Sequence, residues 1–143
     1  MSLDFAHGLF IAETYLVQTK ENSAVLYSIS YLPTTENRDA AYQYVKTHTD
    51  AQTLDDTPCG KALCTQGFHS TADIASDELK QIWRIASERF IAAASGDVKA
   101  FVANADKRST FCSVEAPAIL KNDKIKTVNG VDKHLFLKDF FID

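Results

Sequence analysis

The densest group of polar residues in the sequence is the stretch from Arg108 to Glu115, Arg-Ser-Thr-Phe-Cys-Ser-Val-Glu. Arg108 carries a planar guanidinium that can hold a phosphate through two parallel hydrogen bonds. Ser109 and Thr110 can each donate a hydrogen bond to a phosphate or a ribose. Glu115 can act as a general base or stabilise a cationic transition state. The stretch therefore predicts a site for RNA or for a nucleotide.

Two reaction classes use these residue types. A metal-independent ribonuclease needs a base, an acid and a cationic group that stabilises the phosphate. Glu115 and Arg108 would supply the base and the cation, and His69 or His134 would supply the acid. An ADP-ribosyltransferase instead needs a glutamate and a Ser/Thr strand that binds nicotinamide, and Ser109 with the residue after it is a partial match.

A non-catalytic interpretation of the same stretch is simpler. Ser109 or Ser113 would cap a helical turn that begins near Glu115 and contains Pro117. The Glu115 carboxylate would then satisfy the free N–H groups at the start of that turn.

The sequence contains three cysteines, Cys59, Cys64 and Cys112. An odd number of cysteines and no recognisable signal peptide fit a reducing cytoplasm. Cys59 and Cys64 flank Gly60 at a spacing that would permit a local disulfide, but two free thiols in a loop are favoured. His69 follows without a fourth ligand nearby, so no metal site is predicted. A Cys–His nucleophile pair lacks a third, orienting group.

The composition limits the protein to a few classes. A chain of 143 residues with 45% hydrophobic and 24% charged residues is typical of one globular domain. The net charge of −4 disfavours dominant electrostatic binding to nucleic acid or to an anionic membrane, although residues 107–143 carry seven basic against five acidic residues. The absence of phosphate-loop, dinucleotide-binding, zinc-protease and serine-hydrolase motifs removes the usual support for those enzyme classes.

The first half predicts a β-hairpin followed by a helix. Residues 9–17 and 23–32 are rich in β-branched and aromatic residues and are separated by a polar turn at 18–22. Thr35 can cap a short helix that starts at Glu36. We expect most tyrosines of this region to pack the hairpin against that helix, and some of them to line a ligand pocket. Residues 49–72 are polar and contain Pro58, and they predict a long loop.

The second half predicts one long helix and several strands. Ser76 would cap a helix over 77–95, whose acidic first turn and following Gly96 are typical helix start and stop signals. Strands are expected at 97–102 and 125–128, a helical turn at 115–120, and an edge strand or short helix at 135–141. We therefore predict a single α+β domain over residues 1–143, with one long helix packed on an antiparallel sheet and an N-terminal β-hairpin plus short helix.

Residues 79–132 resemble a known family. The matching residues are Trp83-x-x-Ala86-Ser87-x-x-Phe90, Ala94-Ser95-Gly96-Asp97-Val98, Ser109-Thr110-Phe111-x-Ser113-Val114-Glu115-x-Pro117-x-x-Leu120-x-Asn122 and Lys126-Thr127-Val128-Asn129-Gly130-Val131. This pattern resembles the C-terminal effector domains of bacterial polymorphic toxins of the filamentous-haemagglutinin-like, contact-dependent type. The aliphatic residue usual before the proline is Ala116 here, and residues 1–75 match nothing in that pattern.

The resemblance implies a small toxin-type effector that acts on RNA or a nucleotide, without a cofactor and with a cognate immunity protein as partner. It would be cytoplasmic as the chain stands, and secreted or delivered if the chain is a fragment of a larger toxin. The alternative is a non-catalytic protein-binding module, either an interaction protein or an immunity-like protein. The acidic balance and the incomplete catalytic motifs favour that alternative, and no membrane association is expected under either hypothesis.

Overall fold

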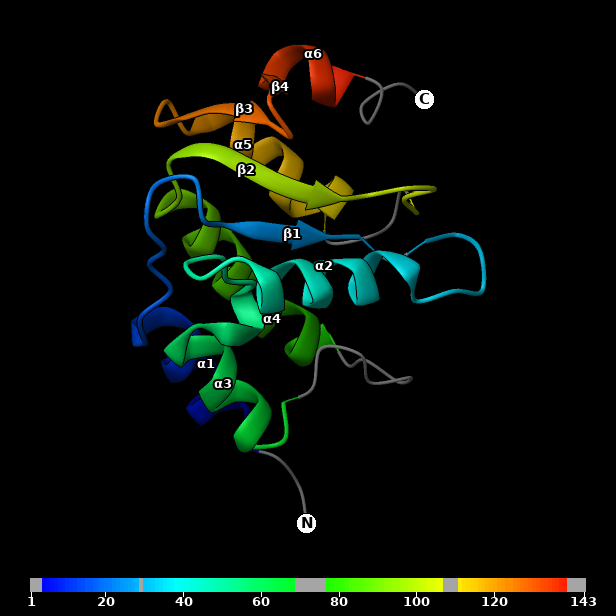
Figure 1. Cartoon of the computed structure of the whole chain (residues 1–143). Helices are drawn as coiled ribbons and strands as arrows, with labels where there is room; N and C mark the ends of the chain where they lie inside the picture. The colour runs from blue at the N-terminus through cyan, green and yellow to red at the C-terminus, as the bar shows by residue number, and fades with distance from the viewer. Residues whose placement is uncertain (1–3, 29, 69–76, 107–110, 139–143) are drawn as a thin grey trace.

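The computed structural model describes residues 4–28, 30–68, 77–106 and 111–138 (Figure 1). The elements, in chain order, are α1 (Phe5–Thr14), β1 (Val25–Tyr27), α2 (Glu36–Thr47), the 3-10 turn η1 (Leu54–Asp56), α3 (Pro58–Thr65), α4 (Asp77–Ala92), β2 (Gly96–Phe101), the π-helical turn η2 (Phe111–Glu115), α5 (Ala116–Lys121), β3 (Ile125–Val128), β4 (Val131–Asp132) and α6 (Lys133–Leu137).

The sheet has four strands in the order β1-β2-β3-β4 and is mostly parallel. β1 pairs parallel with β2, so that Leu26 lies opposite Ala100, and β2 pairs parallel with β3. Only β3 and β4 form an antiparallel pair among the described strands, joined by the Asn129–Gly130 turn. The fold is α+β, but the predicted antiparallel sheet and N-terminal hairpin are wrong.

The first predicted hairpin strand is helix α1. Asp4 caps this helix by accepting a hydrogen bond from the His7 amide at 3.3 Å. Gly8 lets the helix approach its neighbours closely, since a Cβ there would lie 2.7 Å from the Ile82 Cδ1 of α4. Ile11 and Ala12 are buried against the core. The N-cap and this packing outweigh the β propensity of residues 9–17.

The predicted loop at 49–72 contains η1 and α3, so the loop prediction is wrong over those residues. Thr57 accepts a hydrogen bond from the Gly60 amide at 3.1 Å and caps α3, and Pro58 takes the first helical position. Cys59 is buried and Cys64 half-buried, and both are free thiols on this helix rather than in a loop.

The remaining predicted elements are confirmed with small shifts of their ends. Helix α2 starts at Glu36, α4 ends at Ala92 rather than at residue 95, and β3 covers 125–128. Of the two alternatives for the C-terminal segment, the short helix is observed as α6. Ser76, the predicted cap of α4, lies outside the described residues.

The packing brings the ends of two strands to one edge. Helix α2 covers β1 and β2, while α4 contacts α1, η1, η2 and α5. The arrowheads of β1 and β2 point the same way in Figure 1, so the segments that follow them leave the sheet side by side. Ligands bind preferentially at such carboxyl ends of parallel strands. Within the described part of the chain, no helix has both the length and the apolar character of a membrane span.

Candidate active site

Two tyrosines and an aspartate from three elements meet at the carboxyl end of β1. Tyr27 is the last residue of that strand, Tyr42 comes from α2, and Asp55 comes from η1. The two phenol hydroxyls each donate a hydrogen bond to Asp55 Oδ2 at 3.1 Å. The tyrosine rings meet edge to face, with centroids 5.8 Å apart and planes at 80°. This arrangement fixes one oxygen of the carboxylate.

The neighbouring Asp56 has a structural role. Asp56 Oδ2 accepts hydrogen bonds at 2.9 Å from both the amide and the hydroxyl of Thr53, and it completes a capping box at η1. Thr57 Oγ1 in turn donates to the Leu54 carbonyl at 2.6 Å. The turn is held by its own side chains, and it directs Asp55 toward the two tyrosines.

Glu115 is the second carboxyl group of this region. It is 7% exposed and occupies the N-cap position of α5, where its side chain makes no capping hydrogen bond. The interpretation of Glu115 as a structural cap is therefore wrong. Burial raises the pKa of Glu115 to about 8, and the nearby negative charge of Asp55 adds to the increase. The negative charge of Asp55 thus reaches Glu115 and opposes its ionisation.

Burial also raises the pKa values of the two tyrosines, Tyr27 and Tyr42. It raises the pKa of Tyr27 well above the ordinary value of a phenol, and the negative charge of Asp55 opposes ionisation further. Burial raises the pKa of Tyr42 as well. Both tyrosines therefore remain protonated donors to Asp55 at any physiological pH.

The sequence prediction found one residue of this cluster. Glu115 lies in it, whereas Arg108, Ser109, Thr110 and His69 fall outside the described residues. Sequence reasoning missed Asp55 because residues 49–72 were interpreted as a loop. It included Tyr27 and Tyr42 only among the tyrosines that pack against the first helix or line a ligand pocket. The signal was present in Thr-Leu-Asp-Asp-Thr-Pro over 53–58, which combines two helix-start patterns with a spare aspartate.

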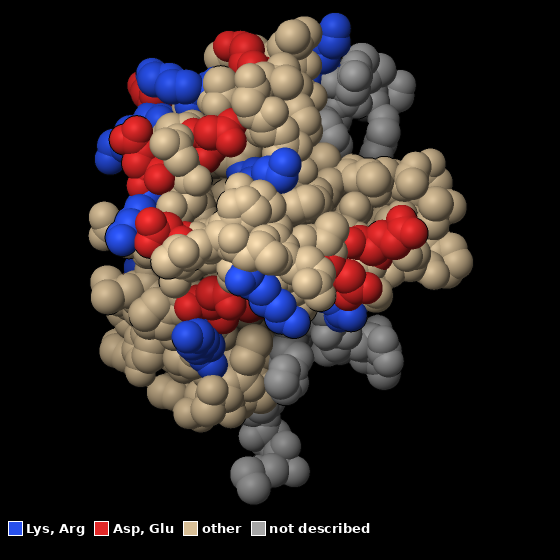
Figure 2. All heavy atoms as spheres, in the orientation of Figure 1, with Lys and Arg blue, Asp and Glu red and all other residues tan. Residues whose placement is uncertain are grey.

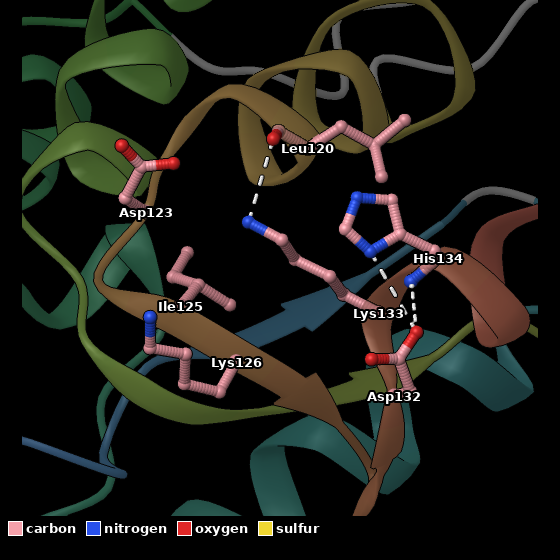
Figure 3. Close-up of a pocket in the computed structure, with 7 residues that line it drawn as sticks. All are labelled: Leu120, Asp123, Ile125, Lys126, Asp132, Lys133 and His134. Atoms are coloured by element: carbon pink, nitrogen blue, oxygen red, sulfur yellow. Dashed lines mark hydrogen bonds and ion pairs between the residues drawn. The ribbon is translucent and has the colours of Figure 1, made fainter.

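A second polar region lies between α5, β3 and α6 (Figure 3). It is an open pocket of about 230 Å³ whose lining includes Asp123, Lys126, Asp132, Lys133 and His134. In the close-up, His134 and Asp132 come from the start of α6, opposite the α5 residue Leu120. Of the predicted candidates that the structure describes, His134, the alternative acid, lies there and Glu115 does not.

The polar groups of this pocket serve the fold. Lys133 is 6% exposed, and its Nζ donates hydrogen bonds to the carbonyls of Ile119 at 3.0 Å and Asn122 at 2.8 Å. Asp132 caps α6 by accepting from the amides of His134 and Leu135. Since these side chains already complete helix ends, the pocket is a weaker candidate than the Asp55 cluster.

The distribution of surface charge and of metal-binding side chains bears on which reactions the site can support. On the face shown in Figure 2, acidic and basic side chains are interspersed and form no single basic area. Among the described residues, no group of three or more His, Cys, Asp or Glu side chains is placed to hold a metal ion. The arrangement that is present, a buried glutamate beside an anchored aspartate, suits the stabilisation of a positive charge.

Comparison with known proteins adds the fold family. No protein-family model and no curated protein sequence matches the chain. Solved structures do match. An Aplysia cyclase complexed with substrate NGD and product cGDPR has 19% identity and a TM-score of 0.56, over 78% of this chain and 49% of that one. The fold resembles that of the ADP-ribosyl cyclases.

Two further structures support this resemblance. An ADP-ribosyl cyclase with a glutamate replaced by alanine has 17% identity and a TM-score of 0.59, over 95% of this chain and 72% of its own. Porcine CD38 with a covalent intermediate, ribo-F-ribose-5'-phosphate, has 21% identity and a TM-score of 0.57, over 88% and 68%. The chain spans about half of the Aplysia cyclase. At these identities the similarity concerns the fold alone.

Proposed function

We propose that this protein cleaves the N-glycosidic bond of a pyridine dinucleotide of the NAD type, with Glu115 facing the ribosyl carbon. The observation that carries the proposal is the buried Glu115 carboxyl group beside Asp55. The ADP-ribosyl cyclase-like fold, whose solved examples hold nucleotide substrates and products, supports the same chemistry.

The reaction suits a site whose described polar groups are two carboxyl groups and two phenols. When the bond between the ribosyl C1′ and the pyridinium nitrogen breaks, its electron pair goes to the nitrogen and neutralises the ring. The leaving base therefore needs no proton, and positive charge develops on the ribosyl group. The Glu115 carboxylate stabilises this charge or bonds to C1′. Water then attacks C1′ and releases a proton to solvent, or a ring nitrogen of the same molecule attacks and closes a cycle.

The raised pKa of Glu115 is compatible with this role. In the empty site the carboxyl group is about half protonated near pH 8. A cationic pyridinium ring favours the ionised form by direct attraction. Asp55 adds a second negative charge, so the site selects a positively charged base over a neutral one. The catalytic group thus becomes fully charged when its substrate arrives.

The same charges disfavour RNA. A polyanion approaching Glu115 and Asp55 would meet two carboxyl groups, and the nearby Arg38 guanidinium, whose charge acts on Tyr42, already pairs with Asp39 at 3.8 Å. The predicted ribonuclease depends on Arg108 and on His69 or His134. Arg108 and His69 lie outside the described residues, and His134 lies in the pocket beside α6. ADP-ribosyl transfer to an acceptor shares its first step with NAD cleavage, and it remains within the proposal.

We also propose the biological setting that the sequence resemblance implies. An NAD-cleaving domain delivered into a bacterial cell would arrest growth by consuming a central cofactor, as a toxin-type effector does. The cognate immunity protein would then cover the Glu115 site. Expression of the chain in a bacterial cytoplasm should lower the NAD pool and stop growth, and a Glu115→Gln chain should do neither.

The direct test is incubation of the purified protein with NAD and, separately, with RNA, with products followed by chromatography. The proposal expects release of nicotinamide together with ADP-ribose or its cyclic form, and intact RNA. Cleavage of RNA with NAD left intact would establish the nuclease instead. No turnover of either, together with a tight stoichiometric protein partner, would establish the binding module.

A further inference from the structure

The segments that follow β1 and β2 are tied together beyond the ends of those strands. The Tyr31 amide donates to the Asn104 carbonyl at 3.0 Å, and Tyr31 Oη donates to Asn104 Oδ1 at 3.2 Å. Ser30 and Ala105 form an isolated antiparallel bridge. Tyr31 is therefore held both at its backbone and at the tip of its ring.

A buried amide reinforces this junction from the helix side. Asn37, at the start of α2, is 7% exposed. Its Nδ2 donates to the carbonyls of Ser28 at 3.0 Å and Ala103 at 2.8 Å. One side chain thus connects the backbone just after β1 with the backbone just after β2. The junction is a built feature of the strand ends.

This scaffold keeps an aromatic ring in water. Tyr31 is 65% exposed, the most of any large aromatic side chain among the described residues, and its neighbour Leu32 is 45% exposed. Asn104 adopts a left-handed backbone, with φ 52°, in order to meet Tyr31. An exposed ring held by hydrogen bonds at both ends is preorganised for a flat, apolar partner.

The residues around Tyr31 and Asn104 carry few charges, and this favours one kind of ligand over others. The sequence over residues 27–35 contains no charged residue, and that over 101–106 contains only Asp106. The loop after β1 extends to one side of the molecule in Figure 1, and its region in Figure 2 is mostly uncharged with some acidic side chains. Within residues 27–35 and 101–106 a phosphate would find no cation, whereas a nucleobase would find a stacking surface.

We propose that Tyr31, anchored by Asn104, is the stacking platform for the second nucleobase of the dinucleotide substrate, the base remote from the bond that is cleaved. This inference rests on the proposed function, because the platform lies at the same strand end as Tyr27. Tyr31 lies four positions after Tyr27, so their Cα atoms are at most about 14 Å apart in an extended chain. That span suits a dinucleotide whose reacting end lies at Glu115 and whose other base lies on Tyr31.

The test compares NAD with nicotinamide mononucleotide, which has the same glycosidic bond but no second base. Affinities are measured by calorimetry in a Glu115→Gln background, so that turnover does not interfere. The wild-type platform should bind NAD more tightly than the mononucleotide. Tyr31→Ala should weaken NAD binding roughly tenfold and leave the mononucleotide unchanged. Tyr31→Phe, which keeps the ring, should lose about two- to threefold.

Tyr15→Ala is the matched control, because Tyr15 is an exposed tyrosine at the end of α1 and should affect neither ligand. Equal affinity for the two ligands, absence of NAD binding, or equal weakening of both by Tyr31→Ala would overturn the platform. Failure of the proposed function is read separately, from the absence of NAD cleavage by the unmodified protein. A protein that cleaves NAD but keeps its NAD affinity in Tyr31→Ala would refute the platform alone.

Discussion

The molecule has two polar regions that each contain a buried ionisable side chain, Lys133 in one and Glu115 in the other, and the surroundings of these two side chains differ. Beside α6, the Lys133 ammonium donates to backbone carbonyls at the end of α5, so its charge is solvated by the protein. Beside β1, the Glu115 carboxyl group lies near a second carboxyl group, Asp55. Among the described residues, neither of these two carboxyl groups forms an ion pair.

The difference separates a structural use of charge from a functional one. A buried lysine whose hydrogen bonds are satisfied stabilises the helix end that it completes. A buried carboxyl group such as Glu115 is unfavourable for folding when it ionises, since burial and the negative charge of Asp55 both oppose its ionisation. Strongly perturbed groups of this kind concentrate at active sites. The following predictions test whether the two regions behave in these opposite ways.

The largest effect is expected on the pH dependence of stability. The folded protein holds the Glu115 proton up to about pH 8, whereas the unfolded chain releases it near its ordinary value of 4.5. The free energy of unfolding should therefore fall as pH rises between these values, by at most about 1.4 kcal/mol per pH unit. Urea unfolding from pH 5 to 8.5 measures this slope, and Glu115→Gln should flatten it and be the more stable protein at pH 8. An unchanged slope in that variant would show that Glu115 titrates normally.

Removal of the Lys133 ammonium should lower stability and leave activity unchanged. Lys133→Met removes the ammonium that donates to the carbonyls of Ile119 and Asn122, which then keep only their backbone donors, the Asn122 and Ile125 amides, and it should lower the free energy of unfolding by about 2 kcal/mol. NAD cleavage per folded molecule should not change. Lys126→Met, an exposed lysine on β3, is the control and should change stability by less than about 0.5 kcal/mol. Loss of activity in a folded Lys133 variant would make the α6 pocket part of the site.

The two adjacent aspartates provide the next comparison. Asp55→Asn removes the negative charge that opposes Glu115 ionisation, so the pKa of Glu115 should fall. The rising limb of kcat/KM against pH, which reports the free enzyme, should move to lower pH by about one unit. Asp56→Asn alters the capping box instead and should lower stability by about 1 kcal/mol with no shift of the limb. Equal shifts in both variants would contradict separate roles.

The smallest effect on activity should come from a substitution of Tyr42, the more exposed of the two tyrosines that donate to Asp55. Tyr42→Phe removes one of the two phenol donors to Asp55 but leaves Tyr27 in place. We expect kcat/KM for NAD to fall about two- to fivefold, because one hydrogen bond to a charged group is lost. Tyr44→Phe is the control, since its ring stacks on His48 away from Asp55. A Tyr42 variant indistinguishable from that control would show that Tyr27 alone orients the carboxylate.

The sequence predicted the second half of the fold better than the first. α4, α5 and β3 carry strong local signals, namely an acidic first turn with an apolar face, a proline in the first turn, and a short β-rich run before Asn129-Gly130. The error over residues 9–17 came from β propensity that the packing of Gly8 against Ile82 overrides. Parallel pairing of β1 with β2 is set by tertiary contacts and has no local signature.

The site was predictable only in part, because most of its residues are distant from one another in the sequence. Glu115 stood out because it ends a dense polar stretch. Tyr27, Tyr42 and Asp55 are separated by 13 to 28 residues in pairs along the chain, and only the fold brings their polar atoms together. Nothing local distinguishes Asp55 from Asp56. The difference between them arises from which one closes the turn and which one faces the tyrosines.

The central claim is that Glu115 acts on the glycosidic bond of a pyridine dinucleotide. The most direct measurement is nicotinamide release from saturating NAD at pH 8 by folded Glu115→Gln and by the unmodified protein. We predict a decrease in kcat of at least about 10³-fold, with NAD binding retained. Nicotinamide release within tenfold of the unmodified protein would contradict the account.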